Sequence, residues 1–307
     1  MSIEVKNLLK VYGEQKAVND ISFSVGKGEI VGFLGPNGAG KSTTMKIITG
    51  YVQPGGGTAV VSGINVAENP LAAKKKIGYL PESNALYYDM YIREYLGFIA
   101  EVHQLGSRKI KQRIEEVIQL TGLTIESKKK IGQLSKGYKQ RAGLAAALIH
   151  DPEVLILDEP TSGLDPNQVI EIREVIRRQG QHKTVLFSSH ILREVEAICD
   201  RVIIINKGTL VADDKLSNLQ QQSSSNIITA QFKEDVPEIL LRNLPAATAV
   251  IKTGPNNWQL TTQEPEALRK QILELSLQHN LNIVSLHSEG RSLEEVFRGL
   301  TNTPAQV

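Results

Sequence analysis

The sequence predicts an α/β fold in which helices cover a parallel β-sheet, followed by a small second domain. Beyond residue 150, apolar runs typical of buried strands alternate with helical patterns, in the order VLILDEP, NQVIEIREVIRR, KTVLFSSH, ILREVEAI and RVIIINKG. This alternation is typical of parallel strands joined by helices that pack on the faces of the sheet. A further buried strand, IVGFL at 30–34, leads into a glycine-rich loop and then a helix.

Two blocks with other patterns accompany this α/β core. Before residue 30, the alternation in IEVKNLLKVY and SFSVGKGEI predicts antiparallel strands, and QPGGGTAVVSG predicts another hairpin. Between about 85 and 150 the pattern is helical and ends in the alanine-rich run AGLAAALIH, which predicts a buried helix. We therefore expect an antiparallel β subdomain and a helical subdomain inserted into the core.

A polar segment divides the chain into two domains. Residues 217–226, SNLQQQSSSN, predict a linker between a domain at 1–216 and a smaller one at 227–307. The order strand, helix, two strands, helix, strand in the second domain predicts an α+β fold of the ferredoxin-like type. Its His279, His287 and Trp258 are isolated in the sequence, which favours packing or bracing of a dimer over chemistry.

Composition excludes several classes of protein. A net charge of +2 in 307 residues gives no reason to expect nucleic acid as a partner. The single cysteine, Cys199, cannot form an internal disulfide. The longest apolar runs are far shorter than the roughly 20 residues that span a bilayer, and the charged start MSIEVKNLLK does not resemble a signal peptide. These features predict a cytoplasmic chain.

The glycine-rich loop carries the most specific motif. GPNGAGKS at 35–42 fits GxxxxGK[ST], and it lies between a strand and a helix as that motif requires. Backbone N–H groups in such a loop bind phosphates, while Lys41 neutralises the outer phosphates and Ser42 offers a hydroxyl to magnesium. The predicted nucleotide-binding residues of this loop are Gly35, Pro36, Asn37, Gly38, Ala39, Gly40, Lys41, Ser42 and Thr43.

Hydrolysis of a nucleotide also needs carboxylates, and two of them end the strand VLILDEP. We expect Asp158 to hold magnesium through water and Glu159 to orient or deprotonate the attacking water. His190 ends the next strand, KTVLFSSH, where it is placed to donate a hydrogen bond to a γ-phosphate. The alternatives are a helix-capping role for Asp158 and a structural role for His190.

Taken together, these motifs resemble the ATP-binding subunits of ABC transporters over about residues 2–215. The resemblance implies a P-loop NTPase core of the RecA-like type, ATP and Mg²⁺ as cofactors, and hydrolysis of ATP. It matches 35–42 to the Walker A loop, 155–159 to the Walker B strand, 162–165 with Asp165 to the D-loop, and His190 to the switch histidine. Tyr12 matches the aromatic residue that stacks on adenine in this family.

The segment LSKGYKQR at 134–141 places basic residues at the start of a helix, where the helix dipole favours negative charge instead. An anion is therefore expected there. The resemblance implies that this is the family's signature LSGGQ, whose Ser135, Lys136 and Gly137 contact the γ-phosphate of ATP held by the opposite subunit. Lys136 replaces a family glycine, Tyr138 replaces a glutamine, and Glu82 in IGYLPE replaces the Q-loop glutamine.

The resemblance also implies partners. With one cassette per chain, the active species is a homodimer or a pair of ATPase subunits that drives a separate transmembrane permease from the inner face of the membrane. The segments IGYLPESNALYYDM, LSKGYKQR and SLEEVFRGLT resemble exporters of the ABC-2 type, and YGEQKAVNDISF resembles the gliding-motility transporter among them. We expect the permease to dock near Glu82 and the aromatic-rich block at 85–105.

Three other readings compete with a transporter subunit. Soluble ABC ATPases that act on ribosomes or DNA usually carry two cassettes or a long coiled-coil insertion, and the sequence has neither. A P-loop GTPase would carry NKxD, but Asn206 and Lys207 are followed by Gly-Thr. A regulator that only binds nucleotide would lack catalytic groups, whereas Glu159 and His190 are present.

Overall fold

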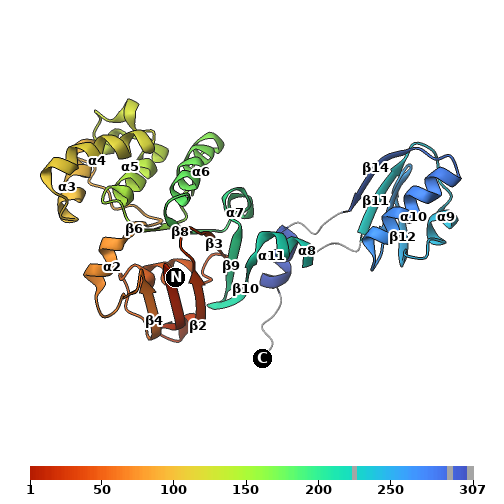
Figure 1. Ribbon diagram of the computed structural model, residues 1–307, viewed down its shortest axis with the longest axis horizontal. Helices are drawn as coiled ribbons and strands as arrows, with labels where there is room; N and C mark the ends of the chain where they lie inside the picture. Colours follow the sequence, from red (N-terminus) through yellow and green to blue (C-terminus); the bar gives the residue numbers. More distant parts are fainter. Residues whose placement is uncertain (223–226, 289–292, 303–307) are drawn as a thin grey trace. The chain divides into compact units, whose positions relative to one another are not determined.

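The computed structural model describes residues 1–222, 227–288 and 293–302 (Figure 1). The chain separates into two compact units, Met1–Leu216 and Ser217–Val307, which are described in turn.

A six-stranded sheet forms the centre of the first unit, in the order β10-β9-β3-β8-β7-β6. Its strands are parallel except for the edge strand β10, which pairs antiparallel with β9. The predicted α/β class with a parallel sheet is therefore confirmed. The strands are β3 (Ile30–Leu34), β6 (Ile77–Leu80), β7 (Val154–Asp158), β8 (Thr184–Ser189), β9 (Arg201–Asn206) and β10 (Thr209–Lys215).

Helices and a second sheet cover the central sheet. In Figure 1, α6 (Pro166–Gly180) and α7 (Leu192–Ile198) lie above it, and the antiparallel sheet lies below. That second sheet has the order β2-β1-β4-β5. Side chains of α1, among them Met45 and Ile48, join both sheets in one buried core. The remaining elements are α1 (Lys41–Ile48), α2 (Pro70–Lys76), β1 (Ile3–Tyr12), β2 (Gln15–Val25), β4 (Gly56–Val61) and β5 (Ile64–Asn65).

The helical block contains α3 (Ile92–Val102), α4 (Ser107–Leu120) and α5 (Lys136–Leu148), with short 3₁₀ turns at Thr124–Glu126 and Ile131–Gln133. The alanine-rich run folds as the second half of α5 and is buried. Small side chains let α5 approach β6 closely: a Cβ at Gly78 would lie 2.2 Å from the carbonyl oxygen of Ala147. The block is thereby fixed to the edge of the central sheet.

The second unit is a four-stranded antiparallel sheet in the order β12-β13-β11-β14. Its chain order of strand, helix, two strands, helix and strand is the one predicted for a ferredoxin-like domain. Trp258 and Phe232 are buried in its core. The elements are β11 (Ile227–Phe232), α9 (Glu238–Arg242), β12 (Ala249–Gly254), β13 (Asn257–Thr261), α10 (Pro265–Gln278), β14 (Ile283–Ser288) and α11 (Leu293–Asn302).

Part of the segment expected to be a linker is helical. Residues Leu216–Gln222 form α8, and Leu216 and Leu219 are buried. Apolar side chains spaced three residues apart share one face of a helix, which explains why this polar stretch is ordered. The rest of the expected linker, 223–226, lies outside the described residues.

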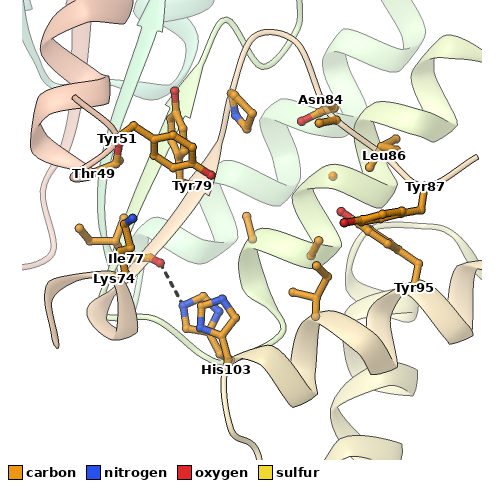
Figure 2. A pocket seen from close by; sticks show the side chains of 17 residues that line it. Thr49, Tyr51, Lys74, Ile77, Tyr79, Asn84, Leu86, Tyr87, Tyr95 and His103 are labelled. Carbon is orange, nitrogen blue, oxygen red and sulfur yellow. Dashed lines mark hydrogen bonds between the residues drawn. The ribbon is translucent and has the colours of Figure 1, made fainter. Parts of the chain in front are cut away.

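Two stacked histidines lie where the helical block meets the central sheet (Figure 2). The rings of His103 and His150 are 3.7 Å apart and nearly parallel, and His150 Nε2 bonds to the carbonyl oxygen of Ile77 at 3.0 Å. A carbonyl only accepts hydrogen bonds, so Nε2 carries the hydrogen. Burial, with a further contribution from neighbouring His103, lowers the pKa of His150 to about 4.

This junction predicts a loss of stability in mild acid. Between the ordinary histidine pKa and about 4, the unfolded chain binds a proton that folded His150 excludes. Stability is therefore fully present above pH 6.5 and falls as the pH drops, by about 2 kcal/mol between pH 7 and pH 5. Urea denaturation followed by circular dichroism measures this, since the one tryptophan lies in the second unit.

The matched variant is His150→Gln, which cannot take up the proton. Its free energy of unfolding should fall clearly less than that of the wild type over the same pH interval. An equal fall in both proteins would contradict the assignment of this pH dependence to His150.

Candidate functional site

The predicted phosphate loop joins β3 to α1, and two of its glycines, Gly35 and Gly40, leave no space for a Cβ. Gly40 has φ +112°, and a Cβ there would lie 2.4 Å from the carbonyl oxygen of Ala17. A Cβ at Gly35 would lie 2.4 Å from the carbonyl oxygen of Ile205. The loop therefore packs tightly on its neighbours, and its backbone leads directly into the first turn of α1, which begins at Lys41.

The order of the strands gathers the other predicted groups beside this loop. β3, β8, β7 and β6 are successive neighbours, and parallel strands end at the same edge of a sheet. Leu34 pairs with Ser189, and Asp158 pairs with Ser188. The phosphate loop, His190, Glu159 and Glu82 follow the ends of these four strands. Groups separated by up to about 150 positions in the chain thus meet at one place.

A pocket of about 530 Å³ lies at this edge. Tyr12 and Glu82, both exposed, line it together with the groups of the phosphate loop and the strand ends. The loop residues Gly35, Pro36 and Ala39, and the buried Asp158, do not line it. The lining residues are Tyr12, Gln15, Ala17, Asn37, Gly38, Gly40, Lys41, Ser42, Thr43, Glu82, Glu159, Ser162 and His190.

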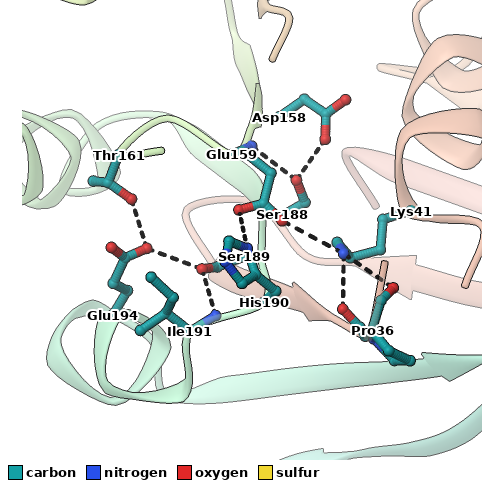
Figure 3. A network of polar contacts seen from close by, with 11 residues as sticks. Pro36, Lys41, Asp158, Glu159, Thr161, Ser188, Ser189, His190, Ile191 and Glu194 are labelled. Carbon is teal, nitrogen blue, oxygen red and sulfur yellow. Dashed lines mark hydrogen bonds and ion pairs between the residues drawn. The ribbon is translucent and has the colours of Figure 1, made fainter. Parts of the chain in front are cut away.

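The carboxylate of Glu159 lies between two basic groups (Figure 3). One oxygen is 2.8 Å from His190 Nδ1 and the other is 3.4 Å from Lys41 Nζ. Because a carboxylate only accepts hydrogen bonds, Nδ1 is the donor in the first contact. Lys41 Nζ also donates to the carbonyl oxygens of Gly35, at 2.7 Å, and Pro36, at 3.3 Å. Lys41, Glu159 and His190 therefore form one connected group of charged and polar contacts at the pocket.

The backbone of Glu159 is strained. Its φ is +49°, in the left-handed region, which costs a side-chain-bearing residue about 1–2 kcal/mol. Ser188 holds it there: Ser188 Oγ accepts from the Glu159 N–H at 2.9 Å and donates to Asp158 Oδ1 at 2.6 Å. Strain of this kind clusters at functional sites, where surrounding bonds maintain it. One serine on β8 thus contacts both the backbone of Glu159 and the carboxylate of Asp158.

Magnesium is compatible with the predicted pair Ser42 and Asp158. Across 1–222, 227–288 and 293–302, no three histidine, cysteine or acidic side chains form a metal site by themselves. Magnesium that accompanies a nucleotide needs only one or two protein oxygens, because phosphates and water supply the others. Of the predicted pair, Ser42 lines the pocket, while Asp158 is buried and accepts a hydrogen bond from Ser188.

The predicted signature residues do not line this pocket. Ser135 is the N-cap of α5 and accepts from the N–H of Tyr138 at 3.5 Å. Gly137 packs against the side chain of Gln168, where a Cβ would collide. A Cβ at Gly163 would collide with the Lys136 side chain, so the signature segment borders the predicted D-loop of its own chain. Within that loop, Asp165 caps α6 by accepting from the N–H of Gln168 at 3.0 Å.

A buried network beside the pocket was missed by the sequence analysis. Glu194 Oε2 accepts from Thr161 Oγ1 at 2.6 Å and from Ser189 Oγ at 2.9 Å (Figure 3). All three residues are buried. The available signal was the position of Glu194, a charged residue four places after His190 on the first turn of a helix.

Comparisons with known proteins agree with this geometry. The ABC transporter family model matches residues 18–162. The ABC transporter ATP-binding protein YxlF of Bacillus subtilis strain 168 is 36% identical over 295 residues, which cover 96% of this chain and 98% of YxlF. The chain belongs to the ABC transporter ATP-binding proteins. As an ABC ATPase, it binds and hydrolyses ATP.

Two further proteins are similar to this ABC ATPase. The linearmycin resistance ATP-binding protein LnrL of the same strain is 34% identical over 304 residues, covering 97% of this chain and 98% of LnrL. A bacterial ABC transporter cassette solved as a dimer is 25% identical, with a TM-score of 0.65 over 70% of this chain and 98% of that one.

Within 1–222, 227–288 and 293–302, no helix is long and apolar enough to cross a membrane.

The role of Ser188 in this ABC ATPase gives a direct prediction. Ser188→Ala removes the acceptor for a buried N–H and leaves Glu159 without its support. We expect the free energy of unfolding to fall by about 1–3 kcal/mol, with a loss of ATP turnover because the carboxylate at 159 is no longer held. Urea denaturation and steady-state ATP hydrolysis measure the two effects.

Ser83→Ala is the control, since Ser83 is exposed and, within the described residues 1–222, makes no hydrogen bond with Glu159, although it follows the lining residue Glu82 in the sequence. It should change neither quantity. Wild-type stability and turnover in Ser188→Ala would show that Glu159 keeps its conformation without this serine.

Proposed function

We propose that this chain is the ATP-hydrolysing subunit of an exporter whose transmembrane part is a separate chain of the ABC-2 type. The observation that carries the proposal is the pocket in which Lys41, Glu159 and His190 meet. Similarity to LnrL over nearly the whole chain supports a transporter of the resistance kind. A role in gliding motility rests only on the resemblance of YGEQKAVNDISF and stays a narrower proposal.

Each side chain at the strand ends has a proposed task. Lys41 binds the outer phosphates of ATP, and Tyr12 stacks on the adenine at the pocket rim. Glu159 orients or deprotonates the attacking water, for which its place beside the phosphate loop is suitable. His190 holds Glu159 through Nδ1 and presents its other ring nitrogen to the pocket. Ser42 and Asp158 hold Mg²⁺, which neutralises charge on the phosphates.

A second chain completes the site in this proposal. Ser135, the N–H of Gly137 and the start of α5 form an anion-binding helix terminus, but they do not line their own chain's pocket. Two chains arranged head to tail bring this terminus to the γ-phosphate of the partner's ATP, and the cassette solved as a dimer supports that arrangement. ATP then bridges the dimer, and hydrolysis releases it.

The proposed docking site for the permease is the aromatic pocket in Figure 2. It has a volume of about 310 Å³ and lies between β6 and the helical block. Tyr87 lines it, and Phe98 packs on Tyr87 with ring centres 5.6 Å apart; both are exposed. The Tyr79 hydroxyl is buried and has no hydrogen-bond partner among the described residues. A docking segment that offers an acceptor would satisfy it.

The proposal predicts capture of a membrane protein. Glu159→Gln should slow turnover by roughly 100-fold or more and hold the ATP-bound state. Affinity capture of this variant from detergent-solubilised native membranes with ATP should recover a polytopic permease in stoichiometric amount. Recovery of ribosomes or nucleic acid without a permease would contradict the proposal and favour a soluble ATPase.

Two further variants locate the docking site in the same capture. Tyr87→Ser combined with Phe98→Ser should abolish recovery of the permease. Ile125→Ser is the matched control, because Ile125 is 85% exposed in the same helical block but does not line the aromatic pocket. Equal recovery with both variants would place the docking site elsewhere.

A further inference from the structure

We propose that Glu194 is a positioning residue for ATP hydrolysis. Its buried carboxylate ties the loop that follows Glu159 to the segment that carries His190. The inference rests on the catalytic roles proposed above for Glu159 and His190, and it does not depend on the identity of the permease.

The contacts of Glu194 join two loops that leave adjacent strands. Thr161 follows Glu159 by two positions at the end of β7, and Ser189 directly precedes His190 at the end of β8. Both hydroxyls donate to the same oxygen of Glu194, at 2.6 Å and 2.9 Å. Ser189 Oγ in turn accepts from the N–H of Ile191 at 3.0 Å. The backbone on both sides of His190 is thereby linked to Thr161 through one carboxylate.

Burial makes this link strong and directional. Glu194 is 3% exposed, and within the described ranges no cation forms an ion pair with it. A buried carboxylate is costly unless hydrogen bonds compensate it, and O–H···O⁻ bonds near 2.6 Å are among the strongest that proteins make. The two hydroxyls therefore have little freedom to leave Glu194, and their loops keep one relative position.

The position of the link explains why it matters for hydrolysis. The Glu159 carboxylate contacts His190 Nδ1 at 2.8 Å. This contact persists only if the loop after β7 and the loop after β8 keep their relative position. Ser188 fixes the backbone of Glu159 from one side. Glu194 fixes Thr161 and the segment next to His190 from the other. Thr161 directly precedes the predicted D-loop at 162–165. Glu194 therefore also connects that loop to the segment that carries the catalytic histidine.

Helix α7, which carries Glu194, is held against the sheet by contacts other than the hydrogen bonds of Glu194. Val195 is fully buried, and a Cβ at Gly32 would lie 2.6 Å from its side chain, so α7 is held against β3 by close packing. Loss of the Glu194 hydrogen bonds should therefore release the two loops and leave α7 in place. This separates a positioning role from a role in holding the fold together.

The test compares steady-state ATP hydrolysis of full-length variants. Glu194→Ala should lower kcat about tenfold or more, since small displacements of catalytic groups have effects of this size. KM for ATP and nucleotide affinity should stay within about twofold of wild type, because the phosphate loop is untouched. Glu194→Gln should restore most of kcat, because its amide oxygen still accepts from the two hydroxyls.

Two additional variants make the test specific. Thr161→Val should resemble Glu194→Ala, and the double variant should be no slower than the slower single, because both remove the same link. Glu196→Ala is the matched control, since Glu196 is exposed on the same helix. If Glu194→Ala fails to fold, Thr161→Val and Ser189→Ala carry the same prediction.

The outcomes separate this inference from the proposed function. Wild-type kcat in Glu194→Ala and Thr161→Val would overturn it, as would an equal loss in Glu196→Ala or a proportional loss of nucleotide affinity. Glu159→Gln is measured alongside. If that variant keeps wild-type turnover, the proposed catalytic role fails first, whereas a slow Glu159→Gln with a fast Glu194→Ala overturns the positioning role alone.

Discussion

The site depends on one constraint, the common edge at which neighbouring parallel strands end. β3, β8, β7 and β6 are adjacent in the sheet, so the loops that follow them must meet. The phosphate loop contributes backbone N–H groups and Lys41, the loop after β8 contributes His190, and the loops after β7 and β6 contribute carboxylates. A different strand order would leave the same residues far apart, because nothing local in the chain brings them together.

The same edge explains how the site tolerates strain. Glu159 keeps a left-handed backbone because Ser188, on the next strand, accepts its N–H. Gly40 keeps a large positive φ because its missing Cβ leaves room for the carbonyl oxygen of Ala17. Glu159 thus keeps a conformation that its side chain disfavours, whereas at position 40 glycine supplies the positive φ without that cost. Packing of the sheet is thus a precondition of the geometry at the pocket.

Motif spacing predicted most of the loop residues that line the pocket and one of the two carboxylates, Glu159, since a GxxxxGK[ST] loop after a strand has few structural alternatives. Motif spacing did not predict the supporting contacts that join one strand to the next. Nothing local marks Ser188 as the support of Glu159, or links Glu194 to Thr161 across 33 positions. The polar stretch after 216 was expected to be a linker, yet two leucines at helical spacing order its first half. The contact of Lys136 with Gly163 likewise depends on tertiary structure.

Completion of the site by a second chain is tested most directly by complementation. Lys41→Ala and Ser135→Ala are purified separately, and their ATP turnover is measured alone and after mixing under conditions that let dimers exchange. If each site combines Lys41 of one chain with Ser135 of the other, a mixed dimer contains one intact site. Turnover should therefore rise on mixing, well above the average of the two variants alone. Turnover that stays at that average would show that Lys41 and Ser135 act within a single chain, or that Ser135 takes no part.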